Sequence, residues 1–269
     1  MARSAQDPWR NGAAPHLPAR LGHFPGVCLL PGDPARVDLA ATVLSDFSVL
    51  GQRREFRIGT GQVAGVPVAV CSTGIGGPST EIAVVELARL GVHTVLRVGG
   101  MGALRDWVRP GSVCAVTHAV PRTGAAAVYA RDSEPRTADP EVLDVLRAEA
   151  TALGTELARI TVASSDTYYL GQGRPLPGLE AASAAHLAAL RGLDVDGIDM
   201  ETETVFSVAR ALGLRAGALL VAHANRATDA WLEDYEPAQL AMLRLAARSA
   251  HRLGQPAQVP PARRDGAPA

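Results

Sequence analysis

Residues 66–100 read VPVAVCSTGIGGPSTEIAVVELARLGVHTVLRVGG, and this stretch decides the fold. An apolar run over residues 66–72 predicts a strand, and a second run over 94–98 predicts another. Between them, a glycine loop leads into a periodic apolar segment that predicts a helix over about 79–90, with Gly91 as its C-cap. This succession of strand, helix and strand is typical of an α/β domain with a mostly buried sheet.

The same alternation continues on both sides of this stretch. Further patterns predict strands at residues 27–30, 113–120, 159–163 and 216–222, and helices at 36–44, 141–153, 181–191, 202–212 and 237–253. Both chain ends are rich in Pro, Ala and Arg and lack apolar periodicity. We therefore expect one folded domain over residues 16–253, between disordered tails at 1–15 and 254–269.

The composition fits a globular protein and excludes several classes of function. The 269 residues are 47% hydrophobic and carry a formal net charge of −1, which gives no sign of a nucleic-acid-binding surface. All the basic residues are arginine, which excludes Schiff-base and P-loop lysine chemistry. Three cysteines without a C-x-x-C pair predict a cytoplasmic location, and no segment suits a membrane span or signal peptide.

Two strand ends carry groups that suit an anion. The segment LLPGDPARV, residues 29–37, passes from a strand through Gly32 into a helix that contains Arg36, and a helix N-terminus with an arginine favours an anion. A plain turn with a solvated arginine fits that segment equally well. Arg97 interrupts an apolar strand just before a glycine run. A buried arginine needs a carboxylate partner or an anionic ligand, and the glycines favour the ligand.

Three further loops were compared with known kinds of site. The glycine loop CSTGIGGPST, residues 71–80, lacks the G-x-G-x-x-G spacing of a dinucleotide site, and a tight turn explains its individual glycines. The segment SSDTYYLGQGR, residues 164–174, offers aromatic rings for stacking together with an amide and a guanidinium. The segment GIDMETE, residues 197–203, places carboxylates at a helix start, where they also match the helix dipole.

Taken in order, these motifs resemble the nucleoside phosphorylases of the purine/uridine phosphorylase superfamily, and the uridine phosphorylases most. The resemblance is carried by PGDPARV (31–37), RREF (53–56), STGIGGPSTEIAVVELARLGV (72–92), LRVGGMGAL (96–104), ASSDTYYLGQGR (163–174), DMETE (199–203) and ANR (224–226). It implies a single-domain α/β fold whose central mixed β-sheet, partly barrel-like, is flanked by α-helices. It also implies phosphorolysis of a pyrimidine nucleoside in salvage or catabolism, with uridine and phosphate giving uracil and ribose 1-phosphate.

The resemblance also implies roles for single residues. The matching positions are Gly32, Arg36, Arg97 and Gly100 for phosphate, Met200 and Glu201 for ribose, and Tyr168, Gln172, Arg174, Arg226 and His223 for the base. Among these, Arg97 would hold the phosphate, Glu201 would favour the developing charge on ribose, and Arg174 would stabilise the leaving base.

Other matches lie between subunits. Arg54 matches an arginine lent to a neighbour's phosphate site, and His16 matches a histidine that reaches a neighbour's ribose. We therefore expect a homo-oligomer, from a dimer to a hexamer, with shared sites. Positions that hold a potassium ion between subunits in some bacterial members are matched by Glu55, Ile75 and Ser79. Apart from that ion and inorganic phosphate as co-substrate, no cofactor is implied, and the seven histidines show no metal-ligand spacing.

Three departures from the family pattern concern the site. Gly100 stands where the family has a threonine that touches phosphate and ribose, and losing such a charge-assisted hydrogen bond costs about 1.5–3 kcal/mol. Asp199 replaces a glutamate, and His223 replaces an apolar residue near the base. The sequence around Asn225 lacks the aspartate that protonates a purine, which argues against a purine substrate.

The alternatives are a purine nucleoside phosphorylase, a phosphate-independent nucleosidase, and a weakly active or non-catalytic nucleoside-binding homologue. The arginines at phosphate positions argue against the nucleosidase, because water needs no such clamp. Only Gly100 motivates the inactive homologue.

Overall fold

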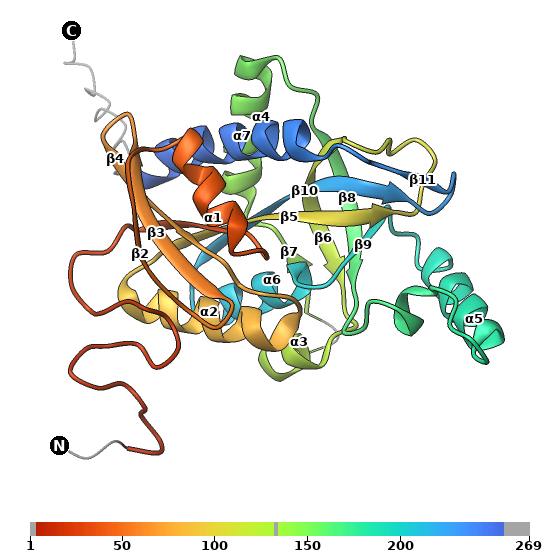
Figure 1. Cartoon of the computed structure of the whole chain (residues 1–269), viewed down its shortest axis with the longest axis horizontal. Coiled ribbons are helices and arrows are strands. Elements are labelled where there is room, and N and C mark those ends of the chain that lie inside the picture. Colours follow the sequence, from red (N-terminus) through yellow and green to blue (C-terminus); the bar gives the residue numbers. More distant parts are fainter. Residues whose placement is uncertain (1–3, 132–133, 256–269) are drawn as a thin grey trace, which may run out of the picture.

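The computed structural model describes residues 4–131 and 134–255, whose strands form one mixed sheet (Figure 1). The strands are β1 (Val27–Leu30), β2 (Ser45–Arg53), β3 (Phe56–Val63), β4 (Val66–Cys71), β5 (Thr94–Ala103), β6 (Val113–Val120), β7 (Arg136–Thr137), β8 (Ala158–Ser164), β9 (Gly197–Asp199), β10 (Arg215–Asn225) and β11 (Ala230–Trp231). Their order in space is β11-β10-β6-β8-β9-β5-β1-β4-β3-β2, with β7 paired to β6.

An additional pairing between β5 and β10 closes part of this sheet into a ring. The ring follows β10, β6, β8, β9 and β5 and returns to β10. The start of β5 lies between two parallel neighbours, because Thr94 pairs with Val27 of β1 and with Arg215 of β10. The predicted α/β fold with a mixed, partly barrel-like sheet is therefore confirmed.

Helices cover both faces of the sheet. They are α1 (Ala35–Leu39), α2 (Gly77–Leu90), α3 (Gly124–Tyr129), α4 (Pro140–Leu153), α5 (Glu180–Arg191), α6 (Thr202–Ala211) and α7 (Glu236–Gly254), with 3₁₀ turns at Ala40–Thr42 and Leu170–Gln172. Figure 1 shows α4 and α7 above the sheet and α2, α3 and α6 below it, while α5 stands to one side. Helix α2 packs on α6, and α4 packs on α7. No helix in the described part of the chain has the length and apolarity to cross a membrane.

Strand β1 shows why the central strands read as continuous apolar runs. All four of its residues are buried. Cys28 and Leu30 join the core on the side of α2 and α6, whereas Val27 and Leu29 join the core on the side of α7. A strand covered on both faces has no solvent side, so its sequence does not alternate.

Several regions differ from the elements predicted. The hairpin of β2 and β3 has no counterpart among the predicted strands, because β2 is largely exposed and carries residues with positive φ, Asp46 and Gly51. The helix expected over 36–44 is shorter, since α1 ends at Leu39 and a 3₁₀ turn follows. Helix α2 begins earlier than Ser79, with Gly76 as its N-cap.

The N-terminal segment also differs from the disordered tail expected over residues 1–15. From residue 4 onward it packs beside α2, where Arg89 pairs with Asp7 at 2.8 Å and stacks on Trp9 at 4.5 Å. Ala14 is buried within the core. These contacts could not be foreseen because they join segments more than seventy residues apart. Residues 256–269 of the predicted C-terminal tail lie outside the described residues.

Candidate active site

A cavity of about 950 Å³ lies at the carboxyl ends of β1, β4 and β5, the place where ligands collect in α/β proteins. The loops after β1 and β4 are joined there by two backbone hydrogen bonds. The amide of Thr73 donates to Pro31 at 2.9 Å, and the amide of Gly74 donates to Gly32 at 3.0 Å. Gly74 has φ +71°, a backbone conformation that favours glycine, and a Cβ atom on Gly32 would lie only 3.3 Å from the carbonyl oxygen of Gly74. The two glycine segments therefore form one wall of the cavity.

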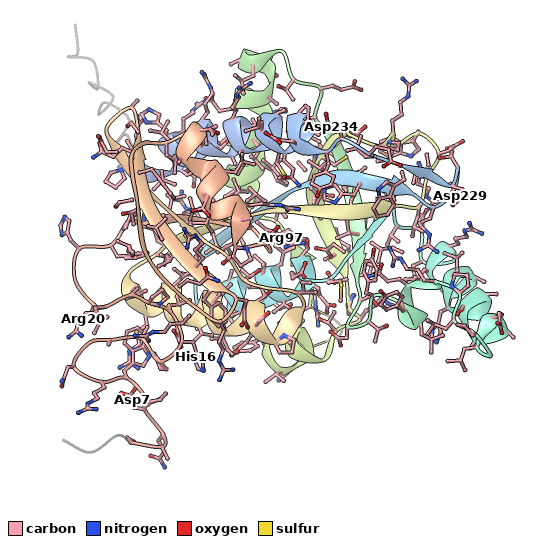
Figure 2. All side chains as sticks on the ribbon, viewed as in Figure 1. Asp7, His16, Arg20, Arg97, Asp229 and Asp234 are labelled. Carbon is pink, nitrogen blue, oxygen red and sulfur yellow. The ribbon has the colours of Figure 1, made fainter. Side chains whose placement is uncertain are left out.

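Arg97 projects from β5 into the centre of this region and is only 3% exposed (Figure 2). Its Nε donates to Oδ2 of Asp199 at 3.0 Å, and its Nη2 lies 2.5 Å from Oε2 of Glu201. Asp199 also accepts from the hydroxyl of Ser164 at 2.6 Å and from the amide of Thr202 at 2.9 Å. Arg97 therefore has both carboxylate partners and a place in the cavity wall, so the two interpretations of this arginine are compatible.

Glu201 connects Arg97 to the glycine loop. Its Oε1 accepts a hydrogen bond from the amide of Gly76 at 2.7 Å. Burial raises the pKa of Glu201, and the charge of Arg97 acts in the opposite direction. The carboxylate is thus desolvated but held in a fixed position by two donors. Gly76, in the loop that lacks a dinucleotide spacing, serves instead to hold this carboxylate.

Arg36 lies in the wall of the same cavity, and its guanidinium forms no hydrogen bond or ion pair with any described residue, although its backbone is bonded within α1. Burial lowers the pKa of its guanidinium, and the charge of Arg97 adds to that effect. Two guanidinium groups thus share one end of the cavity, and only one of them is neutralised by carboxylates. An anion with several oxygens fits such a place, because guanidinium donors bind phosphate-like groups in a bidentate manner.

The lining of the cavity also includes groups that suit a polar aromatic ligand. Arg174 lies over the ring of Tyr168, 3.6 Å from its centroid, and donates to Oε1 of Gln172 at 2.7 Å. Burial lowers the pKa of Arg174. All three side chains line the cavity, as does Met200. Arg226, which we expected at the base, does not line it. It donates instead to the carbonyls of Gln172 and Gly173 at 3.0 and 3.3 Å, and so holds their turn in place.

Comparison with known proteins agrees with this geometry. The family profile described as Phosphorylase superfamily matches residues 27–255. The chain belongs to the phosphorylase superfamily. It is 39% identical over 221 residues to a uridine phosphorylase of Thermococcus kodakarensis, covering 81% of this chain and 80% of that one.

Two further relatives define the range of this similarity. A uridine phosphorylase of Haemophilus influenzae is 39% identical over 203 residues, or 74% of this chain and 81% of the relative. A guanosine phosphorylase of Halorubrum lacusprofundi is 34% identical over 211 residues, or 78% and 83% of the two chains. The resemblance inferred from the motifs is thereby confirmed for this member of the phosphorylase superfamily.

Gly100 and His223 are in close contact in the cavity wall. A Cβ atom on Gly100 would lie 2.5 Å from Cε1 of His223, so the imidazole fills the space of a side chain at position 100. The Nε2 atom of His223 is buried and has no hydrogen-bond partner in the described structure. Burial, followed by the charge of Arg36, lowers the pKa of His223 to about 4.

The depressed pKa of His223 predicts a loss of stability in acid. Its folded pKa of about 4 lies below the ordinary value of 6.5, so folding favours the neutral ring. The contribution of His223 to the free energy of unfolding is complete above pH 6.5 and is lost as the pH falls from 6.5 towards 4. Allowing for solvent screening, we expect a loss of about 1 kcal/mol at pH 5. Urea unfolding at pH 7 and pH 5 should show this loss in the wild type and a smaller one in His223→Gln. Equal losses in both proteins would contradict the assignment.

Besides Arg226, two predicted site residues lie outside this cavity. Arg54 is exposed at the turn between β2 and β3, with φ +52°. His16 lies in the N-terminal segment, away from the centrally placed Arg97 (Figure 2). Its Nδ1 pairs with Glu86 of α2 at 2.6 Å, and Glu86 also accepts the amide of Leu17 at 2.8 Å. Neither residue serves the cavity of its own chain.

The residues predicted to hold potassium gather around Gly74. Side-chain atoms of Glu55 and Ser79 lie within 3.2 Å of the place where a Cβ atom of Gly74 would be, and the Ser79 hydroxyl donates to the carbonyl of Ile75 at 3.3 Å. A carboxylate, a hydroxyl and a carbonyl carry the oxygen atoms that hard cations prefer, and a large hard cation takes about six to eight of them. Three such residues would not complete that number, so a cation bound here would need ligands from a second chain.

Several residues of the cavity wall were not foreseen. They are mostly apolar and include Pro78, Ile82, Met101, Ile198 and Trp231. They come from four elements, α2, β5, β9 and β11, and no sequence pattern distinguishes such residues from ordinary core or surface residues. Asp199 had been noted as a substitution and as one of the carboxylates at a helix start, but not as a partner of Arg97.

Proposed function

We propose that this chain is a pentosyltransferase that cleaves uridine with inorganic phosphate to give uracil and ribose 1-phosphate. One observation carries the proposal. A single cavity joins the guanidinium groups of Arg36 and Arg97, the buried carboxylate of Glu201, and the hydrogen-bonded pair of Gln172 and Arg174. Phosphate, ribose and a pyrimidine need these three kinds of contact, in this order.

In the proposed reaction a phosphate oxygen forms a bond to C1′ of the ribose while the bond from C1′ to N1 of uracil breaks. The bonding electrons leave with the base, which then takes a proton. Arg36 and Arg97 would hold the phosphate, and Glu201 would bind the ribose hydroxyls and favour the positive charge that develops on the sugar. Arg174 and Gln172 would donate to the uracil oxygens as the base becomes negative.

Uracil release from uridine, with and without inorganic phosphate, tests this proposal. We expect release only with phosphate, accompanied by an equal amount of ribose 1-phosphate. Equal release without phosphate would show that the protein is a nucleosidase, and the position of Arg36 in the cavity would then have no explanation. Binding of uridine without release in either case would make it a non-catalytic homologue.

A purine nucleoside is the second candidate, because one relative is a guanosine phosphorylase. The side chain of Asn225, however, is 1% exposed and is used within the fold, where it donates to the carbonyls of Arg105 and Val108 at 2.8 Å and accepts from Ala227. It is therefore not free to donate to a purine. Guanosine and inosine in the same assay should react far more slowly than uridine, and a reversed preference would favour the purine enzyme.

We also propose that the active unit is a homo-oligomer in the cytoplasm, in which Arg54 and His16 complete a neighbour's site. In support, both residues lie outside their own cavity, and Arg54 is exposed. A potassium ion shared by Glu55, Ile75 and Ser79 of two chains belongs to the same proposal. In a sedimentation experiment, the active protein should run as an oligomer and not as a monomer.

Mixed oligomers test the shared site directly. Arg54→Ala and Glu201→Gln should each inactivate the protein. When equal amounts of the two variants are refolded together, about half of the dimers should be mixed. Each mixed dimer has one intact site out of two, so about a quarter of all sites should be active. The matched control is Arg36→Ala with Glu201→Gln, since both residues belong to the same cavity and no mixed dimer has an intact site. No restoration in the first mixture would show that Arg54 does not act across an interface.

A further inference from the structure

His223 is the extra residue of a β-bulge. In the parallel pairing of β10 with β5, Ala222 is opposite Met101 and Ala224 is opposite Gly102, so His223 has no partner in the ladder. A bulge bends its strand and re-aims a side chain, and bulges are common beside active sites. Here the irregular position places the imidazole over the backbone of β5 at Gly100.

The contact with Gly100 is close enough to make the two positions interdependent. A Cβ atom at position 100 would lie 2.5 Å from Cε1 and 2.7 Å from Nδ1 of His223. Real Cβ atoms do not approach ring atoms so closely. With the ring in this position, a residue larger than glycine fits at position 100 only if the ring moves.

The surroundings of the ring place it at the phosphate end of the cavity. Gly100 follows Arg97 on β5 by three residues, and Arg36 lies close enough for its charge to act on the ring. Tyr235 covers the ring from outside, with centroids 5.3 Å apart and planes at 35°. A neutral imidazole has one donor and one acceptor nitrogen, and a buried polar atom without a partner is costly. Nε2 has no partner among the described residues, and Nδ1 lies 2.7 Å from the place of a Cβ atom at position 100, so the ring can donate a hydrogen bond to a ligand beside Gly100.

We propose that His223 binds the incoming phosphate, to which its uncharged imidazole donates a hydrogen bond in place of a side chain at position 100. This inference rests on the proposed use of phosphate as co-substrate. It changes the role of His223 from a contact to the base to a contact to the phosphate. It also explains why glycine and histidine occur together at two positions 123 residues apart in sequence.

Calorimetric titration with inorganic phosphate tests the inference without requiring turnover. His223→Leu keeps an apolar side chain in the space but removes both nitrogens. We expect it to weaken phosphate binding by about 10- to 100-fold, the effect of one hydrogen bond to a charged group. The matched control is His186→Leu on the exposed face of α5, which should bind phosphate as the wild type does.

A second pair of variants tests the exchange of roles. Gly100→Thr alone should lose phosphate binding, because its side chain meets the ring. Combined with His223→Ala, the same threonine should regain at least tenfold over either single variant, since its hydroxyl enters the vacated space. Circular dichroism checks that each variant is folded.

The outcomes separate this inference from the proposed function. Unchanged phosphate binding in His223→Leu would show that the ring only fills space, and would overturn the inference while phosphorolysis could stand. Normal phosphate binding with the expected loss in His223→Leu, but no uracil release by the wild type, would overturn the proposed function alone. A wild type that does not bind phosphate would overturn both.

Discussion

Replacing Arg97 with methionine should abolish activity, with kcat/KM lower by at least about 10³-fold, and should destabilise the fold. Methionine keeps much of the apolar volume but removes the guanidinium that faces both Asp199 and Glu201. Each carboxylate then remains buried without its ion-pair partner. Removing one partner of a buried pair costs about 3–5 kcal/mol. Urea unfolding and steady-state kinetics measure the two effects separately.

A double variant distinguishes the structural from the chemical part of this loss. Adding Glu201→Gln to Arg97→Met removes one of the orphaned charges, so part of the stability should return while activity stays absent. The matched control is Arg105→Met, because Arg105 pairs with the exposed Asp194 and such surface pairs contribute at most about 1 kcal/mol. If Arg97→Met were as stable as Arg105→Met, the central ion pairs would not contribute to the fold as argued here.

Glu201→Gln alone should lower kcat by about 10²- to 10³-fold while the protein remains folded. The amide oxygen of glutamine can still accept the hydrogen bond from Gly76, so the loop keeps its anchor. The negative charge that favours the developing sugar cation is lost. Arg97 is at the same time released from one carboxylate, so the KM for phosphate should not rise.

The neighbouring Glu203 provides the control for this variant. Its carboxylate accepts the amides of Arg122 and Thr123 at 2.8 Å and lies beside Arg136, and it does not line the cavity. Glu203→Gln should therefore lower the melting temperature but leave kcat within a few-fold of the wild type. A larger loss of kcat in Glu203→Gln than in Glu201→Gln would contradict the assignment of Glu201.

The sequence was informative where a charged residue occurs at a position that its apolar neighbours predict to be buried. A lone arginine in an apolar strand identified Arg97 as central, because a buried guanidinium must have a partner. Glycines at strand ends likewise identified the loops of the cavity. The central strands were predicted closely, with β1 and β6 matching their expected bounds, since burial on both faces gives long apolar runs.

The remaining features depend on contacts that no local pattern encodes. Strand β2 is an exposed edge strand with irregular backbone, so neither alternation nor an apolar run marks it. The N-terminal segment is ordered by Glu86 and Arg89, which lie on a helix far along the chain. The place of His223 over Gly100 follows from a single unpaired residue in β10, and composition does not report such a bulge.

The closure of the sheet has a consequence for how the protein opens. Strand β5 belongs to the ring through β9 and β10, and to the open part of the sheet through β1. Neither part can separate without breaking pairs to this strand. The amide protons of β5 should therefore be among the last to exchange with deuterium, and only through global unfolding. We therefore expect the strand that carries Arg97 to fluctuate little, so that motion during turnover comes mainly from the loops around it.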